Sequence, residues 1–354
     1  MAQPVCSVGN ESPNAALIQM ALAYRRSAVL CAAARLGVAD ALGDEVRDLD
    51  FLSKTCQADA DALYRLLRAL ASLGVTEETA PKQFRLTSFG GPLRKDAPQS
   101  AWPSVIFYGD LIADSYTWLA DCVRTGRPAS DVRDPNVPTR WSQYPDALSV
   151  FHAVMGTAAV EDYVPIAAAW DFSHASVVAD LGGGGGSLIL AVLKLNPHLR
   201  GMLVDREGSI EAAQSRFARE DLFSRCKLTV ADLTQSVPAG ADVYMLKQVL
   251  HGFKDAEAIA ILKNCRAVIP QSGCLLVIEF ILPRLVSQAD PQLEGHLMSD
   301  LGMLAITGGR ERSELEWQAL LEAAGFSLTR AYTVRCDTLM IGDVGILEAK
   351  PVQG

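Results

Sequence analysis

Hydrophobic and polar positions alternate between strand and helix patterns in the second half of the chain. From residue 176 onward, short apolar runs that end in a polar residue are separated by longer segments with helical spacing. The predicted strands lie at 177–180, 202–205, 227–230, 242–246, 274–279, 327–334 and 339–348, and helices follow at 188–193, 256–268 and 315–324. Alternating strands and helices predict an α/β domain with a mostly parallel sheet, which binds ligands at the carboxyl ends of its strands.

The first half of the chain has helical spacing instead. Residues 14–42 are so rich in Ala and Leu that almost every face of the predicted helix is apolar. Such a helix is buried in its own domain or against a second subunit, and we expect a dimer interface. The helical segments 49–53 and 59–70, with a hairpin at 75–79 and 83–87, form a winged-helix pattern. It serves either DNA binding or dimerisation, and a second helix poor in basic residues favours dimerisation.

A third stretch, residues 94–170, joins these two parts. It has helical patterns at 104–118, 146–157 and 158–170, and a segment rich in Pro and Asp at 125–144 that we expect to be a loop. Aromatic and thioether side chains recur along it. Such a stripe is typical of a core, but it also suits a lid that closes over the second half of the chain.

The composition excludes several classes of partner. The net charge of −9 argues against nucleic acid and anionic membrane surfaces, because both require a basic face. No apolar run approaches the roughly 18 residues that a membrane span needs, and the first residues lack the pattern of a signal peptide. The eight cysteines show no C-x-x-C pair, which is typical of reduced thiols in the cytoplasm. We therefore expect a cytoplasmic protein.

A glycine-rich turn separates the first predicted strand from its helix. The strand ends at Asp180, and five glycines follow at 182–186. Glycine can adopt a positive φ and lets a ligand approach the backbone closely. Turns of this kind bind NAD, FAD, nucleotides or S-adenosylmethionine (SAM), or are loosely packed loops, so the turn does not choose among them.

Polar residues also follow the later strands. Asp205 follows the second strand, where a carboxylate suits the two hydroxyls of a ribose. Asp232 and Leu233 follow the third strand, at the place for an adenine amino group and an apolar neighbour. Lys247 ends the fourth strand, where it either faces a carboxylate tail or is a solvated or salt-bridged lysine. These positions predict an adenosine site without distinguishing NAD from SAM.

His251 is the candidate general base. It lies just past the fourth strand, and an imidazole there has a pKa suited to accepting a proton near neutral pH, although a lone histidine is more often structural. Glu279 ends the fifth strand, and Glu311 lies in a later segment with two glycines. Two carboxylates from neighbouring elements can orient the imidazole and stabilise its cation.

These motifs resemble the SAM-dependent O-methyltransferases of the caffeic-acid type, with their bacterial antibiotic-tailoring relatives, over nearly the whole chain. Residues 180–186 look like the family's D-x-G-G-G-x-G loop, which assigns Asp180, Gly182 and Gly184 to SAM binding. Asp205 matches the family's ribose-binding acid, and Asp232 and Leu233 match its adenine-binding pair. Lys247 matches the lysine that follows strand four.

The segment 246–257 resembles the family's catalytic segment L-K-x-V-L-H-D-W-x-D-E, with Gly252 and Phe253 in place of Asp-Trp. The resemblance implies His251 as the general base, flanked by its two glutamates. Phe151 and Met155 match the family's substrate-clamping aromatic residue and methionine. The segment from Asp300 to Thr307, which includes Met303, is implied to line the same acceptor pocket.

The architecture implied is a Rossmann-like SAM-methyltransferase sheet after an N-terminal helical, winged-helix domain. The expected domains are a dimerisation domain at 1–100, a helical linker and substrate lid at 101–170, and a SAM-binding catalytic domain at 171–354. The implied reaction moves a methyl group from SAM to a hydroxyl of a small aromatic natural product and leaves S-adenosylhomocysteine. We expect a homodimer whose partner is this acceptor, with no nucleic acid or membrane.

Alternatives remain open at this point. The same fold can use SAM without methyl transfer, for hydroxylation, decarboxylation or a pericyclic step, or can methylate carbon or nitrogen. A non-catalytic winged-helix regulator is a third possibility, against which the retained histidine and glutamates argue. The five histidines show no metal-ligand spacing, so we expect no metal; coordination through His251 and His296 is the alternative.

Overall fold

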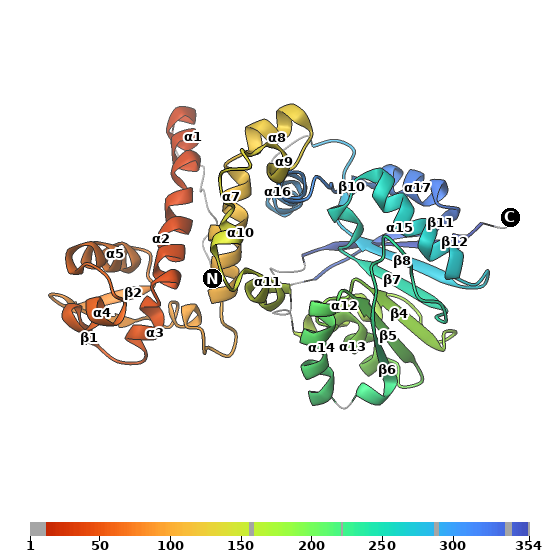
Figure 1. Ribbon diagram of the computed structural model, residues 1–354, viewed down its shortest axis with the longest axis horizontal. Coiled ribbons are helices and arrows are strands. Elements are labelled where there is room, and N and C mark those ends of the chain that lie inside the picture. Colours follow the sequence, from red (N-terminus) through yellow and green to blue (C-terminus); the bar gives the residue numbers. More distant parts are fainter. Residues whose placement is uncertain (1–11, 156–158, 221, 287–289, 337–341, 353–354) are drawn as a thin grey trace. The chain divides into compact units, whose positions relative to one another are not determined.

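The computed structural model describes residues 12–155, 159–220, 222–286, 290–336 and 342–352 (Figure 1). The chain divides into two compact units, residues 1–113 with 140–150 and residues 114–139 with 151–354. The three-domain division expected from the sequence stays a prediction. No helix in the described ranges has the length and apolar character needed to cross a membrane.

The first unit contains helices and a small antiparallel sheet of strand order β1-β3-β2. Its helices are α1 (Pro13–Leu22), α2 (Tyr24–Arg35), α3 (Val38–Leu42), α4 (Leu49–Thr55), α5 (Ala60–Ser72), α6 (Trp102–Ile106) and α10 (Arg140–Gln143). Its strands are β1 (Arg47–Asp48), β2 (Thr76–Ala80) and β3 (Gln83–Leu86). Asp48 and Asp59 begin α4 and α5, since each carboxylate accepts a backbone N–H of the first turn. The predicted helix pair and wing are confirmed.

The single helix predicted over 14–42 is wrong, because the structure has three helices there. Gly37 takes a φ of +66°, a left-handed conformation that ends α2 before α3 begins. The apolar surface of α1 is not covered within its unit: Leu17 and Met20 are each 65% exposed and Tyr24, the first residue of α2, is 66% exposed.

The helix predicted at 104–118 is interrupted by a π-helical turn, Phe107–Ile112. Asp110 lies within this turn and is buried, and its carboxylate pairs with Arg35 at 3.0 Å and with Arg140 at 3.3 Å. Both arginines belong to the same unit, so the irregular turn coincides with a tertiary ion-pair network that local spacing does not reveal.

The second unit is built on a seven-stranded sheet of order β11-β12-β8-β7-β4-β5-β6. Its strands are β4 (Val177–Leu181), β5 (Arg200–Asp205), β6 (Cys226–Val230), β7 (Val243–Lys247), β8 (Cys274–Glu279), β11 (Phe326–Val334) and β12 (Val344–Pro351). The first five are parallel to one another, β12 pairs antiparallel with β8, and β11 pairs antiparallel with β12. The predicted α/β sheet is confirmed; part of the last predicted strand, 339–341, lies outside the described residues.

Helices cover both faces of this sheet. They are α12 (Val164–Ala168), α13 (Ser187–Leu195), α14 (Glu207–Arg219), α15 (Asp255–Val268) and α17 (Glu314–Ala323). Val178 belongs to a buried cluster with α12, α13 and α14, whereas its neighbour Ala179 belongs to one with α15 and α17, because successive side chains of a strand point to opposite faces. Figure 1 shows the two groups of helices on opposite sides of the sheet.

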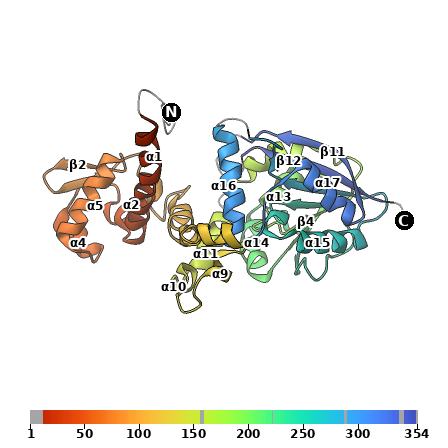
Figure 2. The same ribbon diagram turned by 90° about the horizontal axis from the view of Figure 1, so that it is seen from above.

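Further helices of this unit lie to one side of the sheet. They are α8 (Leu119–Thr125), α9 (Ala129–Val132) and α16 (Pro291–Ile306), while α7 (Ala113–Tyr116) and α11 (Ala147–Met155) cross the unit boundary. α16 packs against α8 and α9 (Figures 1 and 2), and the Tyr116 hydroxyl donates to the carbonyl of Met298 at 2.9 Å. The short α9 and α10 lie where a loop was expected at 125–144, and the sequence analysis did not predict α14 or α16.

Candidate active site

The loop after β7 places His251 at the edge of the sheet. Gln248 takes a φ of +51°, a left-handed conformation that residues other than glycine rarely adopt. The three backbone amides that follow, at 249–251, donate hydrogen bonds to Oε1 of Glu279 with N···O distances of 3.0, 2.9 and 3.4 Å. Three N–H groups converging on one oxygen hold the loop against the end of β8 and suit a charged carboxylate.

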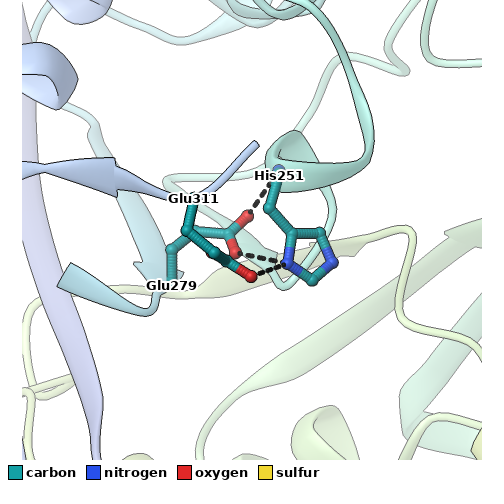
Figure 3. A group of neighbouring side chains, drawn as sticks. All are labelled: His251, Glu279 and Glu311. Atoms are coloured by element: carbon teal, nitrogen blue, oxygen red, sulfur yellow. Dashed lines mark hydrogen bonds and ion pairs between the residues drawn. The ribbon is translucent and has the colours of Figure 1, made fainter. Parts of the chain in front are cut away.

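Glu311 reaches the same place through a two-stranded parallel ladder. β9 (Ile281–Leu282) follows β8, and β10 (Arg312–Ser313) pairs with it, so that Glu311 stands beside the end of β8. Nδ1 of His251 lies 2.8 Å from Oε1 of Glu311 and 3.7 Å from Oε2 of Glu279, as Figure 3 shows. The two glutamates are 1% and 0% exposed and the histidine side chain 16%. The structure therefore brings together the trio predicted from the sequence.

The charges of this trio determine what the imidazole can do. Burial opposes the imidazolium, but the charges of Glu279 and Glu311, with the hydrogen bond to Glu311, outweigh burial and raise the pKa of His251. Burial raises the pKa of the Glu279 carboxyl, against the attraction of the imidazole. Because Nδ1 donates to Glu311, the neutral ring carries its lone pair on Nε2, which is the atom able to accept a proton.

The backbone around His251 is tightly supported. A Cβ on Gly309 would lie 2.1 Å from the carbonyl oxygen of His251, which accepts the amide of Arg310 at 2.8 Å. The fully buried Arg312 donates to the carbonyls at both ends of 250–253, at 3.2 and 2.9 Å. This support could not be expected from the sequence, because only the structure shows that Arg312, one residue after Glu311, is buried.

The glycine turn after β4 has the conformation that its composition predicts. Gly182, Gly184 and Gly186 take φ values of +68°, +55° and +78°. A Cβ on Gly183 would lie 2.5 Å from Oδ2 of Asp180. The backbone of the turn thus passes directly over the carboxylate that ends the strand, where a side chain would not fit.

Asp180 and Lys247 form a second cluster of buried charge. Asp180 is 1% exposed, and neither of its oxygens has a hydrogen-bond partner among the described residues. Burial, with the charge of Asp205, raises the pKa of Asp180 to about 7, against the opposing effects of Lys247 and of the Ile189 amide. Burial lowers the pKa of Lys247 to about 8, and its Nζ lies 5.1 Å from the ring centre of Tyr163. An unsatisfied buried carboxylate is costly, so the cluster suits a ligand that carries a cationic donor.

The remaining predicted cofactor residues follow β5 and β6. The carboxylate of Asp205 accepts the amide of Gly184 at 2.7 Å and the amide of the next residue at 2.6 Å, which joins β5 to the glycine turn. Asp232 is exposed, and hydrogen bonds from Thr234 lower its pKa. Leu233 is buried. Because β4, β5 and β6 are parallel neighbours, their ends line one edge of the sheet.

The predicted acceptor residues lie on two helices. Phe151 and Met155 are four residues apart on α11, and Met303 is on α16. Met303 follows Ser299 by one turn, and the Ser299 hydroxyl donates to Oε1 of Glu311 at 2.9 Å. This face of α16 therefore adjoins the trio, whereas the approach of the α11 pair to the imidazole stays a prediction. A cavity of about 720 Å³ in the first unit contains none of these residues.

Two residues of α16 contact Glu311, and only one of them, Ser299, was not expected from the sequence, because Asp300 begins the segment implied to line the acceptor pocket. They are Ser299, through its hydroxyl, and Asp300, whose Oδ1 accepts the Glu311 amide at 2.8 Å. Their spacing from Met303 marks one face of a helix, but that signal depended on recognising α16. His296, the second histidine of the metal alternative, stacks on Phe280 with ring centres 4.1 Å apart. The absence of a metal stays a prediction.

Known proteins resemble this chain over most of its length. Residues 140–327 match the model of an O-methyltransferase domain, and residues 18–91 that of an O-methyltransferase dimerisation domain. The chain is 32% identical to phenazine O-methyltransferase PhzM of Lysobacter antibioticus, covering 95% of this chain and 96% of that protein. It is 36% identical to the O-demethylpuromycin-O-methyltransferase of Streptomyces alboniger, covering 90% and 85%. The O-methyltransferase NcsB1 from neocarzinostatin biosynthesis, solved with S-adenosylhomocysteine and 1,4-dihydroxy-2-naphthoic acid, matches with a TM-score of 0.78 at 29% identity, covering 98% and 100%.

Proposed function

The chain belongs to the O-methyltransferase family, and from this premise we propose that it methylates a phenolic hydroxyl of a small aromatic natural product, with His251 as general base. The observation that carries the proposal is the hydrogen-bonded trio, in which Glu311 holds Nδ1 of His251 and leaves Nε2 for the acceptor. SAM, when bound, supplies a methyl group on a sulfonium that needs no further activation.

The chain's own task is to deprotonate and position the acceptor. A phenol has a pKa of about 10 and is a poor nucleophile at neutral pH. Nε2 of His251 accepts its proton, while Glu279 and Glu311 stabilise the resulting imidazolium. General-base catalysis contributes about 10²–10⁴-fold, and holding the acceptor oxygen in line supplies much of the rest.

The second cluster of charge fits SAM. The unpartnered carboxylate of Asp180 complements a cationic amino group, and the Lys247 ammonium complements a carboxylate. Asp205 has oxygen lone pairs for ribose hydroxyls beside the amides it already accepts. Asp232 and Leu233 supply an acceptor and an apolar surface for adenine. This assignment accounts for the orphaned oxygens of Asp180 with the ligand that the family uses.

The dimerisation domain supports a homodimer formed through the first unit. The exposed Leu17, Met20 and Tyr24 carry apolar surface that a second copy would bury. Light scattering should report twice the chain mass. A monomer at micromolar concentration would contradict this part of the proposal.

Turnover with a panel of aromatic hydroxyl compounds tests the reaction. We would incubate purified protein with SAM carrying a ¹³C-methyl group and with hydroxyphenazines, hydroxynaphthoic acids and 3-amino-4-hydroxybenzoate. The last compound carries a hydroxyl and an amino group on one ring, so the ¹³C shift of the product separates O- from N-methylation. An O-[¹³C]methyl product supports the proposal.

The other outcomes distinguish the alternatives. A ¹³C-methylamine product would identify an N-methyltransferase. Conversion of the acceptor without a labelled methyl group would identify SAM-assisted chemistry of another kind. Binding of S-adenosylhomocysteine without conversion of any phenol would contradict the proposal.

A further inference from the structure

One oxygen of Glu311 accepts two hydrogen bonds at the active site. Oε1 accepts from Nδ1 of His251 at 2.8 Å and from the hydroxyl of Ser299 at 2.9 Å. The other oxygen, Oε2, is buried and has no hydrogen-bond partner among the described residues. The imidazole and the hydroxyl therefore share the negative charge of a single carboxylate oxygen.

Ser299 does not make the hydrogen bond that a helical serine usually makes. Serine inside a helix commonly donates to the carbonyl four residues earlier on its own helix. Ser299 lies in the middle of α16 and instead donates across 12 residues to Glu311. The helix that carries Met303 is thus connected to the acid that orients the base.

We propose that Ser299 is a positioning residue that limits the basicity of His251 by donating a hydrogen bond to Oε1 of Glu311. The inference rests on the proposed function, because the basicity of His251 affects the reaction only if this residue is the base. A general base must be unprotonated before it can accept a proton. Two buried carboxylates beside the ring favour the imidazolium, and a second donor on the shared oxygen weakens that preference.

Removal of the Ser299 hydroxyl should change the electrostatics at His251 more than the position of the Glu311 carboxylate, because the backbone holds Glu311 in place. Its amide donates to Asp300, and the preceding Arg310 amide donates to the carbonyl of His251, each at 2.8 Å. The following residue enters β10, which is paired with β9. Without Ser299, the carboxylate still faces Nδ1 but has lost its other donor.

Other charged groups around the imidazole stay the same in such a variant. Glu279 on β8 favours the imidazolium and Lys247 on β7 opposes it. On α16, His296 and Asp300 lie near Glu311. A difference between wild type and a Ser299 variant therefore reports the hydroxyl alone.

The experiment measures the pKa of His251 by NMR without requiring an acceptor. The protein is labelled with ¹³C at histidine Cε1 and saturated with S-adenosylhomocysteine, and the spectrum of a His251→Gln variant identifies the signal among five histidines. Ser299→Ala should raise the pKa of His251 by roughly half a unit to one unit, because a charged acceptor loses one of two donors. Ser299→Thr retains the hydroxyl and should leave the pKa unchanged. Glu311→Gln should lower it, which shows that the signal responds to this contact.

An unchanged or lowered pKa in Ser299→Ala would overturn the inference. If that variant fails to fold, Ser299→Cys, whose thiol is a weak donor, should raise the pKa by a smaller amount, and no rise there would be equally decisive. With an acceptor from the screen, the acid limb of the kcat/KM profile of Ser299→Ala should move to higher pH, with activity restored as the pH is raised. A pKa rise without methylation of any acceptor would refute the proposed function alone, whereas an unshifted pKa in an active enzyme would refute only this inference.

Discussion

The two clusters of buried charge in the second unit differ in how far the protein itself satisfies them. In the trio, Oε1 of Glu279 accepts three amides, and Oε1 of Glu311 accepts the imidazole and a hydroxyl. In the cluster of Asp180 and Lys247, the proposed SAM site, Asp180 is equally buried, yet neither of its oxygens is hydrogen-bonded among the described residues. The proposed base is therefore held by the protein's own groups, whereas the proposed SAM site has unpartnered oxygens that a ligand can satisfy.

This difference follows the chemistry that each cluster serves. A base acts in the transition state, and dipoles already in place need no reorganisation when the proton moves. A binding site gains affinity when a ligand donates to groups that lack partners, and the protein accepts lower stability until the ligand binds. Predictions for the two clusters should therefore separate turnover from binding and stability.

The largest effect is expected at the base. His251→Ala should lower turnover by about 10²–10⁴-fold, the usual contribution of general-base catalysis. The affinity for S-adenosylhomocysteine, measured by calorimetry, should stay near the wild-type value, because His251 belongs to the trio alone. Replacement of the exposed His174 by Ala is the matched control and should change neither quantity. A large loss of affinity in His251→Ala would show that His251 also contributes to cofactor binding, and the two clusters would then not act separately.

Asp205→Ala should show the opposite pattern, a loss of cofactor affinity with little loss of turnover at saturation. It removes a charged acceptor that also joins β5 to the glycine turn, so S-adenosylhomocysteine should bind roughly 10- to 100-fold more weakly, equivalent to about 1.5–3 kcal/mol. At saturating SAM, turnover should recover most of the wild-type value. Unchanged affinity would show that the ribose lies elsewhere.

Asp180→Asn tests the cost of the unsatisfied carboxylate. The pKa is about 7 in the folded protein and 3.8 in the reference state, so between these pH values the folded state binds the extra proton and stability falls as pH rises. That shift corresponds to roughly 4 kcal/mol, which is the upper limit of the stability that Asp180→Asn should recover at pH 8. Urea unfolding should find the variant more stable than wild type at pH 8 and equal to it below pH 4.

Bound S-adenosylhomocysteine should reverse this order of stability between wild type and Asp180→Asn. S-adenosylhomocysteine at saturation should stabilise wild type more than Asp180→Asn, because only the carboxylate gains a charged partner. A variant less stable than wild type at pH 8 without ligand would show that Asp180 is satisfied after all, and the contrast between the clusters would fail.

The smallest effect is expected beside the base itself. A Cβ on Gly252 meets no atom within 4 Å, so Gly252→Ala should change stability by less than about 0.5 kcal/mol and leave turnover intact. Gly309→Ala is the contrasting control, since its Cβ would lie 2.1 Å from the His251 carbonyl and would displace the loop. Thermal unfolding and turnover measure both. A damaging Gly252→Ala would mean that this side of the loop is packed.

Much of the catalytic region followed from the order of residues. Asp205 and Glu279 each end a strand, Asp180 is the last residue but one of β4, and His251 follows β7 closely. Since the carboxyl ends of parallel strands meet at one edge of the sheet, the strand pattern alone predicted that these side chains gather there. The same local logic failed where tertiary contacts decide the backbone, as at the π-helical turn around Asp110.

The sequence by itself determined which residues stand at the sheet edge, because strand periodicity and glycine conformation are local properties. Only the tertiary structure decided which of them are partners. The pairing of β10 with β9 brings Glu311 to Nδ1 of His251, and α16 supplies Ser299 to the same oxygen. Burial left Asp180 without a donor. Hydrogen bonds between segments distant in sequence and exclusion from water depend on the packed chain, which no local pattern encodes.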